Sequence, residues 1–259
     1  MKHSYKSFPK VNIFLKITGK RGSYHTISSR FVKIKSFYDE IEFEPSNKGF
    51  DVTGNFSCEV QQNSIYKAYV ALIEHLGDKE AVLRKFFADK KVVVEKRVRE
   101  GSGLGGGSSN AATFLLMCND FLELGLSLKE LSMIGSKVGA DVPFFVYGFD
   151  SANVGGVGEI VEEFDEVLPD IEVFTPDIFC STPEVYRCFR EEFFKTSNAE
   201  EWEGLRSSEA LRIHTPYELN DLLEPALKLY PELRQYVDSG MFFSGSGSSF
   251  FRVNNAVCS

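Results

Sequence analysis

The chain has 259 residues and a net charge of -8 at neutral pH, and its composition is 43% hydrophobic and 25% charged. A chain of this length buries roughly three quarters of the surface that its unfolded form exposes, enough for one large or two modest domains. The charge balance argues against nucleic acid as the main partner, although a small phosphate ligand needs only a local site. No apolar run approaches the roughly twenty residues of a membrane-spanning helix.

Five cysteines are present, and they form no Cys-x-x-Cys pair and lack the clustered spacing of a zinc site. We therefore expect reduced, structural thiols at Cys58, Cys118, Cys180, Cys188 and Cys258. The N-terminus leads into an alternating pattern instead of the apolar core of a signal peptide. This pattern predicts a cytoplasmic protein that does not associate with membranes.

The N-terminal part of the chain reads as strands followed by helices. Apolar residues at every second position of 11–17 predict a strand, and a turn at 19–23 leads into another extended stretch at 29–35. Further expected elements are a strand around Ile41 and Phe43, a helix from a cap at Asn63 to Gly77, and a short helix over 80–87.

The most informative stretch runs from Gly101 to Ala112, where residues 101–107 include five glycines. An apolar run at 92–94 precedes it, and apolar residues at helical spacing follow it, so the pattern predicts a strand, a loop and a helix. Glycine lets the backbone approach a ligand closely, and the N–H groups at a helix start attract anions. The stretch therefore predicts a phosphate-binding loop, with Ser108, Ser109 or Asn110 as the helix cap.

Three other interpretations of this stretch are weaker. A flexible glycine–serine linker would not be flanked so closely by patterned apolar segments. Gly101, Gly103 and Gly106 formally satisfy the dinucleotide-binding fingerprint, but the acidic residue that it requires would be Asp120 or Glu123, which fall within the helical pattern. A P-loop is excluded because no Lys-Ser or Lys-Thr pair follows the glycines.

The second half of the chain mixes helices and strands. Ser127 and Glu130 form a capping box for a helix that ends near Gly139, and small residues over 151–158 suggest a domain boundary. The remaining expected elements are strands at 159–161 and 171–174, a helix over 183–194, helices from about Glu218 and Glu232, and two strands at 241–243 and 250–253 around a glycine–serine loop. This mixture indicates an α+β or α/β fold.

Three separated motifs resemble the GHMP kinases, the superfamily named for galactokinase, homoserine kinase, mevalonate kinase and phosphomevalonate kinase. The motifs are Pro9–Gly19, Leu104–Ala112 and Phe243–Ser248. Their order and spacing match the superfamily across nearly the full length. The resemblance implies a two-domain α+β fold. Residues 1–150 would form an ATP-binding domain with a left-handed β-α-β unit, and 151–259 a four-stranded sheet backed by helices, with the active site in the cleft between them.

Additional motifs resemble the branch of the superfamily that acts on a cytidine diphosphate-linked methylerythritol. They are Lys10 before Asn12, Tyr24-His25, Gly139–Phe145, Ser181–Tyr186 and Leu219–Leu222. Two positions depart from this branch: Arg99 replaces a proline two residues before Gly101, and Ser23 replaces a glycine before Tyr24. Arg99 removes a rigid turn residue from the approach to the loop, and Ser23 makes its turn less permissive of positive φ.

The resemblance implies that Asp141 is the catalytic base and that Lys10 holds the attacking hydroxyl and its developing negative charge. Each residue has a simpler interpretation. Asp141 precedes Pro143 and would serve equally well as a helix cap. Lys10 would be a solvated lysine at a strand end.

On the substrate side, the resemblance implies that Tyr24 and Tyr186 stack on cytosine while His25 binds its polar edge. The other substrate-binding positions that it implies are Asn12, Gly245, Ser246 and Gly247. The simpler interpretations are core packing for Tyr186, a solvated side chain for His25, and a tight hairpin turn for the second glycine loop.

On the nucleotide side, the resemblance implies that ATP is bound with Mg²⁺ bridging its phosphate oxygens, and Ser108 is the candidate metal-side hydroxyl. The implied ATP-binding positions are Gly101, Ser102, Gly103, Leu104, Gly105, Gly106, Gly107, Ser108, Ser109, Asn110, Ala111, Asn63 and Lys96. A helix cap explains Asn63 almost as well, and a solvated strand lysine explains Lys96 almost as well.

The expected reaction is ATP-dependent phosphorylation of the 2-hydroxyl of the cytidylylated methylerythritol. The expected partner is this small molecule, with no nucleic acid and no membrane, and the protein would be a monomer or a weak homodimer. One alternative is a homoserine or mevalonate kinase, which should lack the set of Tyr24, His25 and Tyr186. The other is a non-catalytic nucleotide-binding protein of the same fold, against which the presence of Lys10 and Asp141 argues.

Overall fold

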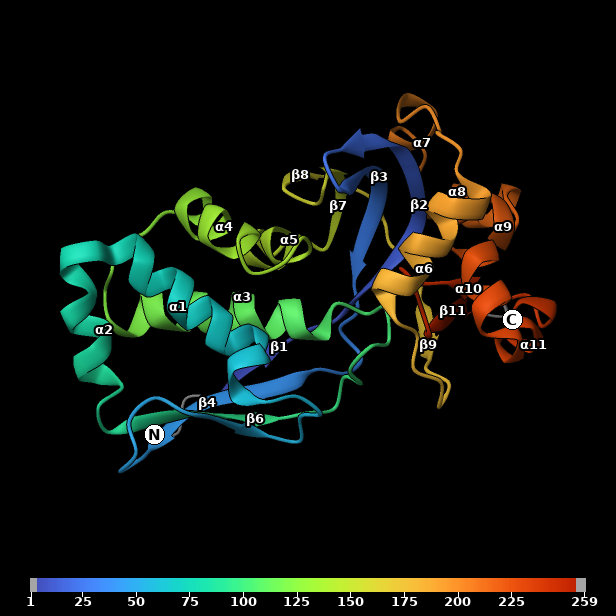
Figure 1. Cartoon of the computed structure of the whole chain (residues 1–259). Helices are drawn as coiled ribbons and strands as arrows, with labels where there is room; N and C mark the ends of the chain where they lie inside the picture. Colours follow the sequence, from blue (N-terminus) through green and yellow to red (C-terminus); the bar gives the residue numbers. More distant parts are fainter. Residues whose placement is uncertain (1–3, 255–259) are drawn as a thin grey trace, which may run out of the picture. The chain divides into compact units, whose positions relative to one another are not determined.

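The structure is a computed structural model that describes residues 4–254 in two compact units (Figure 1). The first unit contains the residues up to Pro9, Lys35–Glu100 and Gly105–Phe149. The second contains Lys10–Ile34, Gly101–Leu104 and the residues from Asp150 onward. The units are therefore interleaved along the chain, whereas the sequence predicted two continuous segments that meet near residue 150.

The first unit is built on a four-stranded sheet in the order β1-β4-β6-β5. Its strands are β1 (Tyr5–Ser7), β4 (Asp39–Pro45), β5 (Val52–Gly54) and β6 (Lys90–Glu95). Ile41 and Val94 face each other across β4 and β6, and both are buried, so this part of the sheet contributes to the core. Strand β5 pairs in parallel with β6, and the chain between them is largely helical. This is a β-α-β connection, and its left hand, which the resemblance implies, stays a prediction.

Helices cover one face of this sheet (Figure 1). They are α1 (Ser64–Leu76), α2 (Glu80–Phe86), α3 (Gly106–Phe121), α4 (Leu128–Ser136) and α5 (Val142–Tyr147), with short 3₁₀ turns at Val60–Gln62 and Gly77–Lys79. Helices α1 and α3 pack side by side next to the sheet, and α4 and α5 pack on them. The local signals predicted two of these helices well. Asn63 caps α1 through its side chain, and Ser127 and Glu130 form the predicted capping box of α4.

The second unit contains two sheets. The four-stranded sheet has the order β2-β3-β7-β8, and the three-stranded sheet has the order β10-β11-β9. The strands are β2 (Lys10–Arg21), β3 (Tyr24–Lys33), β7 (Ser151–Gly156), β8 (Ile160–Glu163), β9 (Ile171–Phe174), β10 (Phe242–Phe243) and β11 (Phe250–Val253). Strand β7 pairs with β3, which explains why residues 10–34 belong to this unit. The small residues expected to mark a boundary therefore form a strand within the sheet.

Short helices complete the second unit. They are α6 (Thr182–Cys188), which continues as a π-helical segment over Phe189–Phe193, α7 (Glu200–Glu203), α8 (Ser207–Ile213), α9 (Pro216–Leu219), α10 (Leu223–Leu229), a 3₁₀ turn at Pro231–Leu233, and α11 (Arg234–Asp238). Leu15 and Ile17 of β2 pack in one apolar cluster with Phe189, Leu223 and Phe250. This cluster therefore packs β2 against α6 and its π-helical continuation, α10 and β11, which lie much later in the sequence.

Polar residues of β2 are buried as well as its apolar ones. Lys16 forms an ion pair with Asp221 at 2.5 Å, and the two side chains are 6% and 0% exposed. Asp221 also accepts a hydrogen bond from the backbone N–H of Ile17 at 2.8 Å. An unpaired buried charge is costly, so removing either partner should strongly destabilise the fold. The alternating pattern of β2 thus marks a strand that is covered on both faces.

Candidate active site

Helix α3 begins earlier than the sequence predicted. Its first residue is Gly106, and the residue before it, Gly105, is in the left-handed conformation with φ 68°. Ser108, Ser109 and Asn110 lie inside the helix, so the prediction that one of them caps it was wrong. Glycine adopts this conformation without steric cost, which lets the chain turn directly into the helix. No side chain of the described residues caps α3, so the N–H groups of its first turn can bind an anion.

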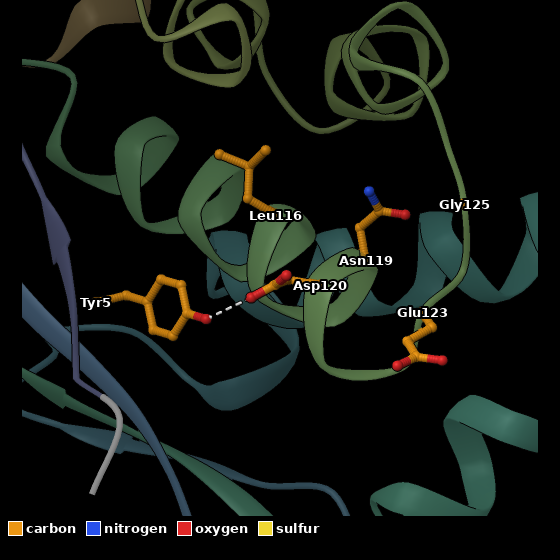
Figure 2. A pocket seen from close by; sticks show the side chains of 6 residues that line it. All are labelled: Tyr5, Leu116, Asn119, Asp120, Glu123 and Gly125. Atoms are coloured by element: carbon orange, nitrogen blue, oxygen red, sulfur yellow. Dashed lines mark hydrogen bonds between the residues drawn. The ribbon is translucent and has the colours of Figure 1, made fainter.

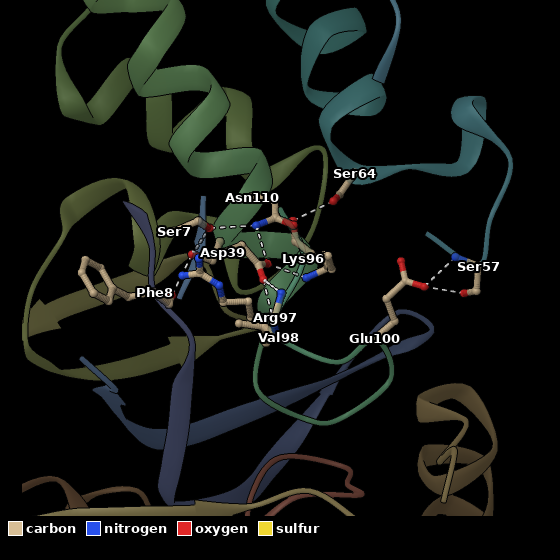
Figure 3. A network of polar contacts seen from close by, with 12 residues as sticks. Ser7, Phe8, Asp39, Ser57, Ser64, Lys96, Arg97, Val98, Glu100 and Asn110 are labelled. Atoms are coloured by element: carbon tan, nitrogen blue, oxygen red, sulfur yellow. Dashed lines mark hydrogen bonds and ion pairs between the residues drawn. The ribbon is translucent and has the colours of Figure 1, made fainter. Parts of the chain in front are cut away.

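The start of α1 lies next to the start of α3. The Ser64 hydroxyl donates a hydrogen bond to the carbonyl oxygen of Gly107 at 2.6 Å (Figure 3). Asn63 is buried, and its Oδ1 accepts from the backbone N–H of Ile65 at 2.9 Å. The helix-cap interpretation of Asn63 is therefore confirmed. Asn63 also precedes Ser64, which contacts the predicted phosphate-binding loop at Gly107.

The segment that follows β6 packs against the first residue of α3. A Cβ atom on Gly106 would lie 2.7 Å from Cγ1 of Val98 and 3.3 Å from Nζ of Lys96. A residue with a side chain cannot fit there without displacing Val98. The Lys96 side chain is 6% exposed, and it forms an ion pair with Asp39 at 2.5 Å. The interpretation of Lys96 as a solvated lysine was therefore wrong.

Asp39 is not among the predicted site residues, yet its carboxylate accepts four hydrogen bonds in this region (Figure 3). The donors are Nζ of Lys96, the backbone N–H groups of Arg97 and Val98, and Nδ2 of Asn110. Asp39 begins β4, which carries further acidic residues at Glu40, Glu42 and Glu44. Nothing in the local pattern distinguishes the buried carboxylate from these three.

Ser109 and Asn110 attach α3 to the N-terminal strand through their side chains. Asn110 Nδ2 donates to the Ser7 hydroxyl at 2.9 Å, and Ser7 donates to the Ser109 hydroxyl at 2.7 Å. Ser109 in turn donates to the carbonyl oxygen of Phe8 at 2.7 Å. These contacts anchor the helix whose first turn is the candidate anion site.

Asp141 precedes α5 and also belongs to the first unit. It is half-buried, and its side chain makes no capping hydrogen bond to that helix within the described part of the chain. The helix-cap interpretation is therefore not supported. A Cβ atom on Gly139 would lie 3.5 Å from the Ser108 hydroxyl, so the segment that carries Asp141 runs beside the first turn of α3.

In the second unit, Lys10 is buried at the start of β2. Its ammonium donates to Oδ1 of Asn12 at 2.6 Å and to the carbonyl oxygen of Gly103 at 3.2 Å. Asn12 donates through Nδ2 to the Ser29 hydroxyl at 2.9 Å. Lys10 is 3% exposed, so the interpretation of a solvated lysine was wrong. Its acceptors fix the position of the ammonium group.

The two glycine motifs pack against each other within the second unit. Gly103 has φ 75°, and a Cβ atom on it would lie 2.3 Å from the carbonyl oxygen of Ser244. A Cβ atom on Gly245 would lie 3.0 Å from the carbonyl oxygen of Gly103. The backbone N–H of Ser249 donates to the carbonyl oxygen of Ser102 at 2.9 Å. Residues 101–104 are therefore held in place, and the flexible-linker interpretation was wrong.

The second glycine loop joins the antiparallel strands β10 and β11 as a hairpin, and the loop is buried. All residues from Ser244 to Ser249 are buried. Asn220 donates through Nδ2 to the carbonyl oxygens of Phe243 at 3.1 Å and Gly245 at 2.9 Å. The hairpin interpretation of this loop is therefore met, and the surrounding residues additionally hold the loop in place.

Two of the three predicted aromatic residues come together. The rings of His25 and Tyr186 stack, with centroids 5.6 Å apart and an interplanar angle of 25°. Phe189 and Phe194 also contact the His25 ring. Tyr24, by contrast, is 69% exposed at the start of β3. Tyr186 also packs against the apolar cluster of the unit, so the core-packing interpretation is met in part.

His25 is buried rather than solvated, and its Nε2 atom has no hydrogen-bond partner among the described residues. Burial lowers the pKa of His25 below 6.5, and the nearby positive charges of Lys20 and Arg190 lower it further. The imidazole is therefore neutral at neutral pH. A buried polar atom without a partner is costly, and a ligand that hydrogen-bonds to it would recover that cost.

A separate hollow of about 550 Å³ lies at the other end of α3 (Figure 2). It is lined by Tyr5, Leu116, Asn119, Asp120, Glu123 and Gly125, and none of these is a predicted site residue. Tyr5 donates to Asp120 at 2.8 Å, and Asn119 exchanges two hydrogen bonds with the backbone of Leu126. Burial and the Asp120 carboxylate raise the pKa of Tyr5 to about 12. Three of the polar side chains that line this hollow are therefore already hydrogen-bonded within the protein.

The sequence predicts that the cysteines are reduced thiols. The four cysteines between residues 4 and 254 are unbridged, and burial raises the pKa of the Cys180 thiol to about 12; Cys258 lies outside the described residues. Within the same range, no cluster of three or more His, Cys, Asp or Glu residues is arranged to hold a metal ion. No helix in the described part of the chain is long and apolar enough to span a membrane.

Comparison with known proteins gives the family. Residues 63–149 match the model of the GHMP kinases N terminal domain. The chain is 53% identical over 255 residues to the 4-diphosphocytidyl-2-C-methyl-D-erythritol kinase of Sulfurimonas denitrificans, covering 96% of each chain. The chain belongs to the 4-diphosphocytidyl-2-C-methyl-D-erythritol kinase family.

The solved structures agree with this family. A crystal structure of 4-(cytidine 5'-diphospho)-2C-methyl-D-erythritol kinase is 31% identical, with a TM-score of 0.76, and the match covers 98% of this chain and 90% of that one. The mevalonate kinase of Methanococcus jannaschii matches with a TM-score of 0.66 at 15% identity, over 98% of this chain and 91% of that one. The second likeness shows the shared α+β fold alone, which confirms the predicted fold class.

Proposed function

We propose that the chain transfers a phosphoryl group from ATP to the 2-hydroxyl of 4-diphosphocytidyl-2-C-methyl-D-erythritol, giving the 2-phosphate and ADP. This reaction belongs to the non-mevalonate route to isoprenoid precursors. The observation that carries the proposal is the 53% identity to a kinase of that name across 96% of both chains. The buried, unpartnered Nε2 atom of His25 independently supports a ligand with a polar edge.

ATP fits the start of α3. The first-turn N–H groups follow a left-handed Gly105, and no described side chain caps them, which suits a phosphate group. Mg²⁺, when bound, compensates the phosphate charges. Ser108 lies in this first turn, and we propose that its hydroxyl faces the metal.

Lys10 and Asp141 would act on the attacking hydroxyl. Phosphoryl transfer depends mainly on positioning and charge compensation, with modest help in removing the hydroxyl proton. Asp141 would accept that proton through its carboxylate. The Lys10 ammonium, oriented by Asn12 and Gly103, would hold the oxygen as negative charge develops.

The cytidine base would bind near His25 and Tyr186. A flat, neutral base is recognised by ring stacking together with a few oriented hydrogen bonds. Tyr186 supplies a ring beside His25, and the exposed Tyr24 is available to stack from another side. The Nε2 atom is fully covered, so a ligand reaches it only when a covering side chain moves. Asn12 and the loop of Gly245, Ser246 and Gly247 complete the proposed substrate site.

Cytidine diphosphate should bind at least about tenfold more tightly than uridine diphosphate. A site whose hydrogen-bonding groups match the polar edge of cytosine leaves some of those groups unpaired when uracil binds. Replacing His25 with phenylalanine keeps a ring against Tyr186 but removes both nitrogens, and it should abolish the preference. Isothermal titration calorimetry measures both affinities. The exposed His75 is a suitable control, and His75→Phe should leave the preference unchanged.

The same binding should be insensitive to pH down to about 6.5. The pKa of His25 is lowered below that value, so the imidazole stays neutral throughout this range. Below it, protonation should change the affinity, and it should also reduce stability, because the fold favours the neutral ring. Equal affinities for the two diphosphates, or a preference that survives His25→Phe, would contradict the cytidine part of the proposal.

Two further expectations accompany the proposed function. We propose a cytoplasmic location, and a monomer or weak homodimer that binds neither nucleic acid nor membranes. The alternative of a mevalonate or homoserine kinase has only fold-level support, at 15% and 17% identity. A non-catalytic nucleotide-binding protein remains the alternative that turnover experiments address.

A further inference from the structure

Asp39 connects three parts of the first unit through one carboxylate. Oδ1 accepts from the backbone N–H groups of Arg97 and Val98, both at 2.7 Å. Oδ2 accepts from Nζ of Lys96 at 2.5 Å and from Nδ2 of Asn110 at 2.9 Å. The side chain of Asp39 is completely buried. Both oxygens are therefore occupied by donors from the end of β6 and from α3 (Figure 3).

The Lys96 ammonium is held at the first residue of α3. Its side chain is 6% exposed, and its Nζ lies 3.3 Å from the position of a Cβ atom on Gly106. A lysine side chain has many rotamers and a strongly hydrated charge, so it stays buried at one place only when it is paired. Asp39 is the charge partner that keeps this ammonium next to the candidate phosphate site.

We propose that Asp39 is a positioning residue for the nucleotide, which acts by holding Lys96 at the start of α3. The inference rests on the proposed function only in taking ATP as the nucleotide bound there. Lys96 would contact the bound nucleotide as a fixed positive charge. Asp39 would not contact the nucleotide, and its effect on binding would pass entirely through Lys96.

Asp39→Asn tests this role. The amide keeps the shape of the carboxylate and one oxygen for the backbone N–H groups of Arg97 and Val98. Its –NH₂ group then faces the Lys96 ammonium, which loses its partner. The Kd for Mg-ADP, measured by calorimetry, should rise about tenfold, the size of one charge-assisted hydrogen bond. In turnover assays, the KM for ATP should rise by far more than the KM for the cytidylylated substrate.

A double-mutant cycle separates positioning from a general loss of structure. Lys96→Met should itself raise the Kd for Mg-ADP about tenfold or more. In the Lys96→Met background, Asp39→Asn should cause no further rise, because the residue through which it acts is absent. A merely structural effect of Asp39→Asn would weaken nucleotide binding to the same extent in both backgrounds.

The Lys16–Asp221 pair in the second unit provides a closely matched control. It has the same separation of 2.5 Å, and its side chains are also 6% and 0% exposed. Asp221→Asn should lower the melting temperature to a similar extent as Asp39→Asn, yet leave the Kd for Mg-ADP unchanged. If Asp221→Asn weakens Mg-ADP binding as much as Asp39→Asn does, the proposal is wrong.

The proposal stays testable if Asp39→Asn does not fold or if the proposed function is wrong. Should Asp39→Asn not fold, Lys96→Met alone decides, since a folded variant with unchanged Mg-ADP affinity would overturn the proposal. Should the protein phosphorylate no alcohol, the proposed function fails, but Mg-ADP binding still tests Asp39. The two failures are therefore distinguishable.

Discussion

Replacing Asp141 with asparagine should lower the turnover number by about two to four orders of magnitude, the usual contribution of a general base. Asparagine matches aspartate in size but cannot accept the hydroxyl proton. Because the amide keeps the shape of the carboxylate, the variant should still fold, and its melting temperature checks this. The measurement is ADP release under saturating substrates, together with calorimetric binding of Mg-ADP.

Binding of Mg-ADP to Asp141→Asn should stay within about twofold of the wild type, because the carboxylate acts on the other substrate. Asp120 is a suitable control in the same unit, since it is hydrogen-bonded to Tyr5 at the opposite end of α3. Asp120→Asn should retain the wild-type turnover number. Undiminished turnover in Asp141→Asn would remove this residue from the mechanism.

Replacing Lys10 with methionine should reduce the turnover number by about two to three orders of magnitude, as the loss of one fixed donor at a site of developing charge does. Methionine preserves much of the buried stem of the side chain but removes the ammonium. Asn12 Oδ1 would lose this ammonium donor and the carbonyl oxygen of Gly103 would keep only the Ser244 hydroxyl among its described donors, so some loss of stability should accompany the loss of activity.

Lys33 offers a matched control for Lys10, because the two residues face each other in the β2–β3 pair. Lys33 forms an ion pair with Asp150 at 3.2 Å. Lys33→Met should therefore change the turnover number by less than about twofold, since surface ion pairs contribute little. If the two variants lose activity equally, the effect of Lys10→Met reflects the strand pair and not the ammonium.

Local signals in the sequence were sufficient for several elements. Asn63 and Gly77 bound α1 as predicted, because each acts within one turn of the helix end. The Ser127–Glu130 box likewise opens α4. The cap of α3 could not be inferred in this way. Several residues in its first turns are good capping types, but the left-handed glycine before them already starts the helix.

Features that depend on distant contacts were not predictable from local patterns. Strand β7 consists largely of small residues, and it becomes a central strand only because Val32 pairs with Ser151 across the chain. The same pairing assigns residues 10–34 to the second unit. The role of Asp39 depends on Lys96 and Asn110, which lie far from it in sequence. The resemblance to a family supplied Lys10, Asp141 and His25, but it did not reveal their contacts.

The most direct measurement is ADP release by the wild-type protein with Mg-ATP and three candidate alcohols in parallel. These are 4-diphosphocytidyl-2-C-methyl-D-erythritol, mevalonate and homoserine. We predict turnover with the first alone, and phosphorus NMR of the product should show a new monophosphate on the 2-hydroxyl beside an intact diphosphate. Turnover with mevalonate or homoserine instead, or binding of ATP without turnover of any of the three, would contradict the proposed function.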